Sequence, residues 1–165
     1  MLAADDARAA VASLVDALVR EGRLERDGDR LATPGTASAG PGAETLAAMD
    51  RLESALDVAA PPSLSDAARA AGCPPDGIRA LESAGRIVRL DDDLAYAAYA
   101  YRRLEARAVE LATVSPLAPA ALRDATGTSR KYVMAILEDL DRRGILRRTP
   151  AGHVPGPRAA ATTNP

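Results

Sequence analysis

The stretch that decides the fold is GTSRKYVMAILEDLDRRGILRRTPAGH, residues 127–153. It reads as an amphipathic helix, a glycine, a short run, a polar turn and a second short run. A Gly after an amphipathic helix favours a left-handed C-terminal cap, and two short alternating runs around a turn predict a β-hairpin. A helix, a Gly and a hairpin in this order form the second half of a winged helix.

The same pattern occurs three times in the chain. Each copy has a Leu, a Gly four residues later and a short alternating run, and the copies start at Leu18, Leu81 and Leu140. In the second and third copies a long helix and a short helix come first, and two helices joined by a short Gly-containing turn form a helix-turn-helix. The sequence therefore predicts tandem winged-helix modules, a mainly α fold with small β wings (α+β).

The copies also predict the domain boundaries. We expect the back half of a truncated winged helix over residues 1–33 and a Pro/Gly/Ser linker over 34–42. Complete winged helices should occupy 43–97 and 98–155, and a disordered tail should occupy 156–165. The first module lacks its first two helices, so we expect the chain to be the tail of a longer protein or a truncated product.

Composition restricts the class of protein. The 165 residues contain no Phe or Trp, and Cys73 is the single cysteine, which excludes an internal disulfide or a cysteine-based metal site. Asp5 and Asp6 interrupt any signal-like run, and no stretch approaches the roughly 20 apolar residues that span a bilayer. We expect a soluble, cytoplasmic protein that needs no cofactor and does not contact membranes.

The net charge of −2 is unevenly distributed. Residues 1–122 have a net charge of −6, whereas residues 123–165 hold seven Arg and one Lys against four acids, a net charge of +4. A basic end on an acidic body indicates that this end meets a polyanion. The alternative is that the charge difference has arisen by chance and that this end binds no polyanion.

The start of the last helix points to the contact. In a helix-turn-helix the first turn of the second helix meets the nucleic acid. The two earlier copies begin this helix with DDAR and PPDG, whose acids repel a polyanion, whereas the third begins with TSRKY. Thr128 or Ser129 can cap the helix, and Arg130 and Lys131 add charge where free N–H groups favour phosphate.

Helical spacing assigns the faces of this helix. Val133, Ile136, Leu137 and Leu140 form the buried stripe. The opposite face holds Lys131, Ala135, Glu138 and Arg142, and we expect an ion pair between Glu138 and Arg142.

Tyr132 is expected either as a partly buried residue at the boundary of this stripe or as a side chain that stacks on a base or bonds a phosphate. Arg147 and Arg148 follow on the strand, and His153 lies where a wing turn would contact a backbone. A solvated surface His is the alternative for His153.

These residues resemble the last winged helix of the bacterial selenocysteine-specific elongation factor, SelB. The resemblance rests on the helix start Thr128–Tyr132, on the core Leu137, Glu138, Leu140 and Asp141, and on the strand Leu146, Arg147 and Arg148. It implies that the chain is the C-terminal part of such a factor, whose last module, 98–155, grips an mRNA hairpin (SECIS) beside a UGA codon. The body of that family binds GTP, but no GxxxxGK[ST] loop occurs in this sequence.

The resemblance implies a non-catalytic, monomeric RNA-binding protein. Ribosome and selenocysteinyl-tRNA would be reached through the elongation-factor body. The predicted RNA-binding residues are Thr128, Ser129, Arg130, Lys131, Tyr132, Arg142, Arg147, Arg148 and His153. Two other functions stay open, a winged-helix DNA-binding transcription regulator and a winged-helix protein-interaction scaffold. No group of residues suggests an active site, and the DDD run at 91–93 is expected in a solvated wing turn.

Overall fold

The computed structural model describes residues 4–27, 30–33 and 41–159, and it divides the chain into two compact units, 1–42 and 43–165. The first unit contains α1 (Ala4–Arg20) and an antiparallel hairpin of β1 (Glu25–Asp27) and β2 (Arg30–Ala32). One helix and one hairpin match the half-module that the sequence predicts. The predicted linker falls mostly on 34–40, which lie outside the described residues.

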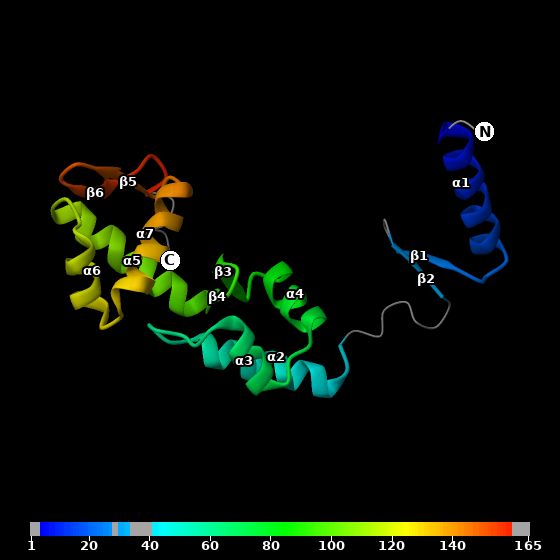
Figure 1. The fold of residues 1–165 in the computed structure, drawn as a ribbon, viewed down its shortest axis with the longest axis horizontal. Helices are drawn as coiled ribbons and strands as arrows, with labels where there is room; N and C mark the ends of the chain where they lie inside the picture. The colour runs from blue at the N-terminus through cyan, green and yellow to red at the C-terminus, as the bar shows by residue number, and fades with distance from the viewer. Residues whose placement is uncertain (1–3, 28–29, 34–40, 160–165) are drawn as a thin grey trace. The chain divides into compact units, whose positions relative to one another are not determined.

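The second unit contains two helix-turn-helix pairs, each followed by a two-stranded wing (Figure 1). The first set consists of α2 (Ala43–Leu56), α3 (Leu64–Ala71), α4 (Pro75–Ser83), β3 (Ile87–Asp91) and β4 (Leu94–Ala97). The second set consists of α5 (Ala98–Val114), α6 (Pro119–Thr126), α7 (Arg130–Arg142), β5 (Leu146–Thr149) and β6 (Gly152–Pro155). The predicted winged-helix fold is confirmed.

The repeated glycines end their helices in the same way. Gly22, Gly85 and Gly144 all have positive φ, between 65° and 71°. At the last of them the amide of Ile145 donates to the carbonyl of Leu140 at 2.9 Å, and the first two copies make the equivalent bond. This closure explains why a Leu precedes each Gly by four residues, and it directs the chain from the helix into the wing.

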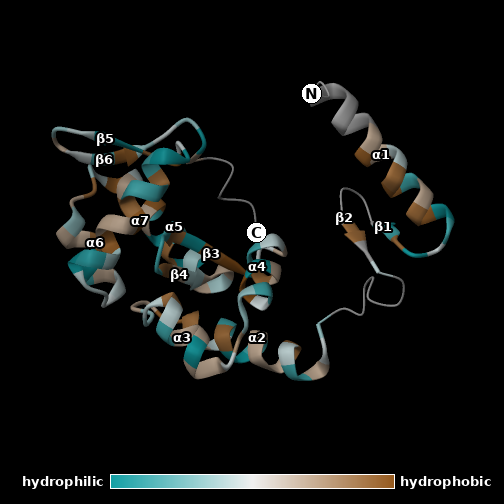
Figure 2. Ribbon diagram, turned by 45° about the vertical axis from the view of Figure 1, so that its right-hand side comes forward, coloured by the Kyte–Doolittle hydropathy of each residue, from teal (hydrophilic) through white to brown (hydrophobic). Residues whose placement is uncertain are grey.

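Each half of the second unit has its own apolar core. Met49, Leu52 and Leu56 of α2 are buried against α3, α4 and the β3–β4 wing, and Figure 2 shows β3 and β4 largely in the brown of apolar residues. Leu46 is an exception, because its side chain is 44% exposed in the first turn of α2.

The second core crosses the predicted boundary between the modules. It contains the buried faces of α5, α6 and α7, and it also contains Leu94 and Tyr96 of the preceding wing. The boundary expected at 97/98 lies between the last residue of β4 and the first of α5, with no residue between the two elements. The two winged helices are therefore packed as one unit.

The end of the described chain differs from the expectation of disorder from residue 156 onwards. The amide of Gly156 donates to the carbonyl of Ile145 at 2.8 Å, and the amide of Arg158 donates to the carbonyl of Gly144 at 3.0 Å. Residues 156–159 thus fold back onto the start of the wing, and 160–165 lie outside the described residues. No helix in the described part of the chain has the length and apolar character that would cross a bilayer.

Candidate nucleic-acid interface

The first turn of α7 presents uncapped backbone amides beside exposed cations. Ser129 is the N-cap residue, but its side chain makes no capping hydrogen bond, and Thr128 also bonds elsewhere. The predicted side-chain cap is therefore wrong. The first amide that bonds within the helix is that of Val133, which donates to the carbonyl of Ser129 at 3.1 Å. The N–H groups of the preceding turn remain available for an acceptor such as phosphate.

The side chains of this turn point to different surroundings. Ser129, Arg130 and Lys131 are exposed. Thr128 is 8% exposed, and its Oγ1 donates to the carbonyl of Ala59 at 2.7 Å. The five residues Thr128–Tyr132 are thus divided between an outward-facing set and a set that packs on protein.

Tyr132 belongs to the inward-facing set. Its hydroxyl donates to the carbonyl of Pro61 at 2.8 Å, and its ring packs edge-on against Tyr96 with centroids 6.4 Å apart. The half-buried boundary position, one of the two expectations, is confirmed. The hydroxyls of Thr128 and Tyr132 are both satisfied by protein carbonyls, and the roles of these two residues toward RNA stay predictions.

Lys131 stands at the outer end of the turn. Its Nζ lies 5.8 Å from the centroid of the Tyr132 ring. Hydrogen bonds from Ser65 hold the pKa of Asp93 below its usual range, and the charge of Lys131 contributes to this lowering. Asp93 follows β3 in the turn of the preceding wing, so the DDD run does lie in a wing turn, and this turn approaches the basic end of α7.

The wing of the last module adds two cations. Arg147 and Arg148 of β5 are exposed, and the amide of Arg148 donates to Oδ1 of Asp141 at 2.9 Å. Between the wing tip and α7 runs a shallow groove lined by Met134 of α7, by residues of the α6 start and by Arg148–His153. Arg148, one of the two cations predicted on this strand, therefore borders a hollow next to the helix.

His153 does not stand on the surface. It is 7% exposed, its backbone pairs with Leu117 through bonds of 2.7 and 2.9 Å, and within the described residues its Nδ1 has no hydrogen-bond partner. The expectation of a wing-tip side chain, solvated or touching a backbone, placed it too far outward. The alternation of β6 places this side chain on the buried side of the wing, which the sequence of the wing alone does not reveal.

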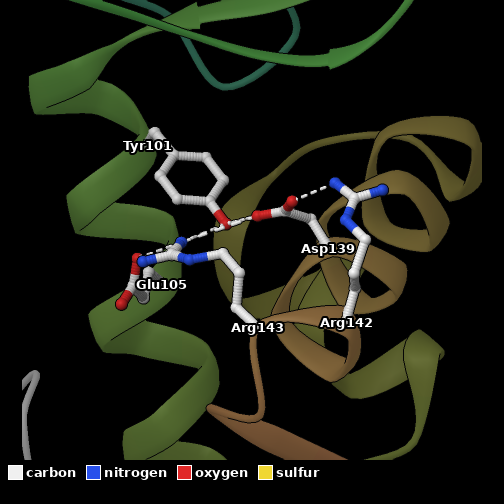
Figure 3. Close-up of polar contacts among 5 residues, drawn as sticks. All are labelled: Tyr101, Glu105, Asp139, Arg142 and Arg143. Atoms are coloured by element: carbon white, nitrogen blue, oxygen red, sulfur yellow. Dashed lines mark hydrogen bonds and ion pairs between the residues drawn. The ribbon is translucent and has the colours of Figure 1, made fainter. Parts of the chain in front are cut away.

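The second half of α7 is held by a buried polar network (Figure 3). The hydroxyl of Tyr101 donates to the carboxylate of Asp139, and Arg143 bonds both the Tyr101 hydroxyl, at 2.9 Å, and Glu105, at 3.0 Å. Burial raises the pKa of the Tyr101 phenol, and the Asp139 carboxylate raises it further. The two buried acids are thus hydrogen-bonded and paired, as buried charges must be.

The ion pair predicted between Glu138 and Arg142 is wrong. Arg142 pairs with Asp139, one helical turn away on the buried side, and its own side chain is mostly exposed. A carboxylate in a dry site attracts a cation more strongly than one in water, which explains the choice of partner. The predicted contact of Arg142 with RNA stays a prediction.

The corresponding helix of the preceding module lacks these features. α4 starts at Pro75 with Pro74 as its N-cap, and Asp76 in its first turn pairs with Arg79. A proline at the first position removes one free N–H, and an acid occupies the place where phosphate would bind. The contrast between PPDG and TSRKY is therefore present in the folded helices.

Comparison with known proteins agrees with this description. Residues 110–154 match the family model of the winged helix of elongation factor SelB. The chain is similar to the winged-helix region of SelB. The resemblance that the sequence carries is confirmed over residues 110–154, from the last turn of α5 to β6, which include the basic helix start. No curated protein was found to match the chain.

Two solved structures have the same fold. The mRNA-binding domain of elongation factor SelB from E. coli, solved in complex with SECIS RNA, is 24% identical with a TM-score of 0.59, and the match covers 70% of this chain and 99% of that one. The bacterial selenocysteine-specific elongation factor EF-Sec is 14% identical with a TM-score of 0.59, over 86% of this chain and 23% of that one. At these identities the likeness establishes the fold.

Sequence reasoning missed the residues that hold the helix in place. Tyr101, Glu105, Asp139 and Arg143 were not singled out, although a charged residue at the edge of an apolar stripe is a signal for a buried pair. Met134 and the groove beside the wing were also missed. Their position depends on how the wing folds back, which no local pattern encodes.

Proposed function

We propose that this chain is the mRNA-binding part of a selenocysteine-specific translation elongation factor and that it grips an mRNA hairpin of the SECIS type. The observation that carries the proposal is the uncapped start of α7, where Arg130 and Lys131 are exposed beside free amides, within the segment that matches the SelB winged-helix model. The solved E. coli relative is itself an mRNA-binding domain in complex with SECIS RNA.

The chemistry of the surface fits RNA. A side chain cannot read bases in the deep, narrow major groove of an A-form helix, but a helix end can hold the backbone near a loop, where unstacked bases are accessible. Arg130, Lys131, Arg147 and Arg148 supply exposed cations for phosphates. Ser129 adds an exposed hydroxyl at the same end. We assign these five residues as the centre of the contact.

The wider role follows from the same proposal. An elongation-factor body would bind GTP and meet the ribosome and selenocysteinyl-tRNA, while this chain would take no cofactor, perform no catalysis and act as a monomer in the cytoplasm. In the solved EF-Sec structure the matched region makes up 23% of the chain. That share leaves most of such a factor for functions outside the winged helices.

The test is a titration of the whole chain with three nucleic acids. The probes are RNA stem-loops taken from beside UGA codons, the same RNA with its loop replaced, and a DNA duplex of equal length, each at several salt concentrations. We expect the tightest binding for one native stem-loop, with an affinity that falls as salt rises. Equal affinity for the DNA duplex would favour a DNA-binding regulator. Absence of polyanion binding would favour a protein-interaction scaffold.

A further inference from the structure

We propose that Tyr132 is a positioning residue for RNA binding: it holds the first turn of α7 on the preceding winged helix and does not itself touch RNA. The inference rests on the proposed function. The α2–α3 connection belongs to the winged helix that has no basic helix start. Under this proposal it positions the basic start of α7 in the following winged helix.

The contact is built from both modules. Two carbonyls of the connection between α2 and α3 accept hydrogen bonds from the start of α7. The hydroxyl of Tyr132 donates to the carbonyl of Pro61, and the hydroxyl of Thr128 donates to the carbonyl of Ala59. Tyr96 of β4 donates to the same Ala59 carbonyl at 3.4 Å. We call this set of contacts the seam. It joins segments about 70 residues apart in the sequence, namely 59–61 and 128–132.

Burial makes the seam firm. Pro61 and Tyr96 are among the fully buried residues of the unit, and the Tyr96 ring also lies 6.4 Å from the ring of Tyr101. The hydrogen bonds of the seam are part-buried and therefore partly shielded from water, and loss of the Tyr132 hydroxyl would take its donor from the Pro61 carbonyl. The ring of Tyr132 is therefore fixed both by its hydroxyl and by its packing.

The seam acts on the segment that carries the cations. Thr128 and Tyr132 are four residues apart and flank Ser129, Arg130 and Lys131. The first turn of a helix without a side-chain cap tends to fray, and here the two flanking hydroxyls anchor it from both sides. Ordering this turn before RNA arrives removes an entropic cost from binding.

The test compares Tyr132→Phe with Tyr99→Phe in the whole chain. The first variant keeps the ring and removes the hydroxyl of the seam. The second removes the hydroxyl of a tyrosine that is 60% exposed on α5. RNA affinity is measured by titration with the stem-loop below the melting transition of each protein. Hydrogen exchange is measured without RNA at the amides of Val133, Met134 and Ala135, the first that bond within the helix.

We expect Tyr132→Phe to lose about three- to tenfold in RNA affinity, the equivalent of one hydrogen bond, and to exchange these amides faster than the parent. Tyr99→Phe should match the parent in both. Thr128→Val, which removes the other hydroxyl with little change of shape, should repeat the effect of Tyr132→Phe. It also provides the test if Tyr132→Phe does not fold.

Each other outcome overturns the proposal. Weaker binding with unchanged exchange means that Tyr132 contacts RNA directly. Lower thermal stability with unchanged affinity means that the seam only stabilises the fold. If the parent chain itself binds no stem-loop, the proposed function fails and this inference fails with it. If the parent binds the stem-loop and both Tyr132→Phe and Thr128→Val bind it equally well, this inference fails and the proposed function stands.

Discussion

Replacing Lys131 by Ala tests the proposed RNA surface at one of its exposed cations. The side chain lies in the first turn of α7, directed away from the buried stripe, and it makes no hydrogen bond or ion pair among the described residues beyond its approach to the Tyr132 ring. We therefore expect the free energy of unfolding to change by no more than about 0.5 kcal/mol. RNA binding should weaken, because a charge that neutralises phosphate is lost.

The expected size follows from counterion release. Each phosphate contact contributes about 0.7 to 0.9 to the slope of log affinity against log salt. Between about 50 and 200 mM salt, a fourfold range, loss of one contact changes the ratio of parent to variant affinity by about threefold. The difference between the two proteins should thus be largest at low salt and should shrink in this proportion as salt rises.

The assay pairs thermal melting with stem-loop titration at four or more salt concentrations. Arg102→Ala is the matched control, since it removes an exposed cation from α5 and leaves α7 unchanged. Lys131→Arg keeps the charge and should keep the slope of the parent. If Lys131→Ala binds with the slope and affinity of the parent, or if Arg102→Ala weakens binding equally, the basic helix start is only a solvated surface and the reasoning is refuted.

Three further outcomes are expected from the same structure. Asp93→Asn should raise stem-loop affinity in the same titration, because it removes a negative charge close enough to Lys131 for that cation to lower the pKa of Asp93. An unchanged or lower affinity contradicts this. Leu137→Ala should cost roughly 2–5 kcal/mol of unfolding free energy in a denaturant titration, since Leu137 is 0% exposed; a loss below about 1 kcal/mol would show a core that collapses around the gap. Burial raises the pKa of the Tyr96 phenol above its ordinary value, so stability that is fully present below about pH 10 should be lost as the pH rises beyond it. In a Tyr99→Phe background, which removes a tyrosine that is 60% exposed, unfolding monitored by circular dichroism should accompany the tyrosinate absorbance of the buried phenols, and their ionisation without unfolding would contradict the assignment.

The fold could be predicted because its signals are local and repeated. A Leu and a Gly four residues apart specify a helix end, and the structure shows the same hydrogen-bonded closure at Gly22, Gly85 and Gly144. The apolar spacing in α7 correctly placed Val133, Ile136 and Leu137 inside. These features depend on residues within one or two turns of each other, which is the range over which a sequence pattern is informative.

The seam could not be predicted in the same way. Helical spacing gives the direction in which Tyr132 points, at the edge of the buried stripe, but it does not say that Pro61 lies there. His153 shows the same limit, since its burial depends on the pairing of β6 with Leu117. Asp139 was missed because its partner Tyr101 lies 38 residues away on another helix. In each case the deciding contact is long-range and involves a polar group.

These long-range contacts explain how α7 can start without a side-chain cap. Replacing a capping Ser or Thr costs a helix about 1 kcal/mol, because one of the first amides loses its acceptor. Here Ser129 leaves those amides free. The seam fixes the first turn through the hydroxyls of Thr128 and Tyr132, and the network around Asp139 fixes the second half of the helix.

Anchoring the helix through the module in front of it keeps every N–H group of the first turn available, whereas a side-chain cap would occupy one of them. Such an arrangement is advantageous only if an external acceptor uses these groups. The packing of the two winged helices into one unit and the exposed cations beside the free amides are therefore parts of the same proposed RNA-binding surface.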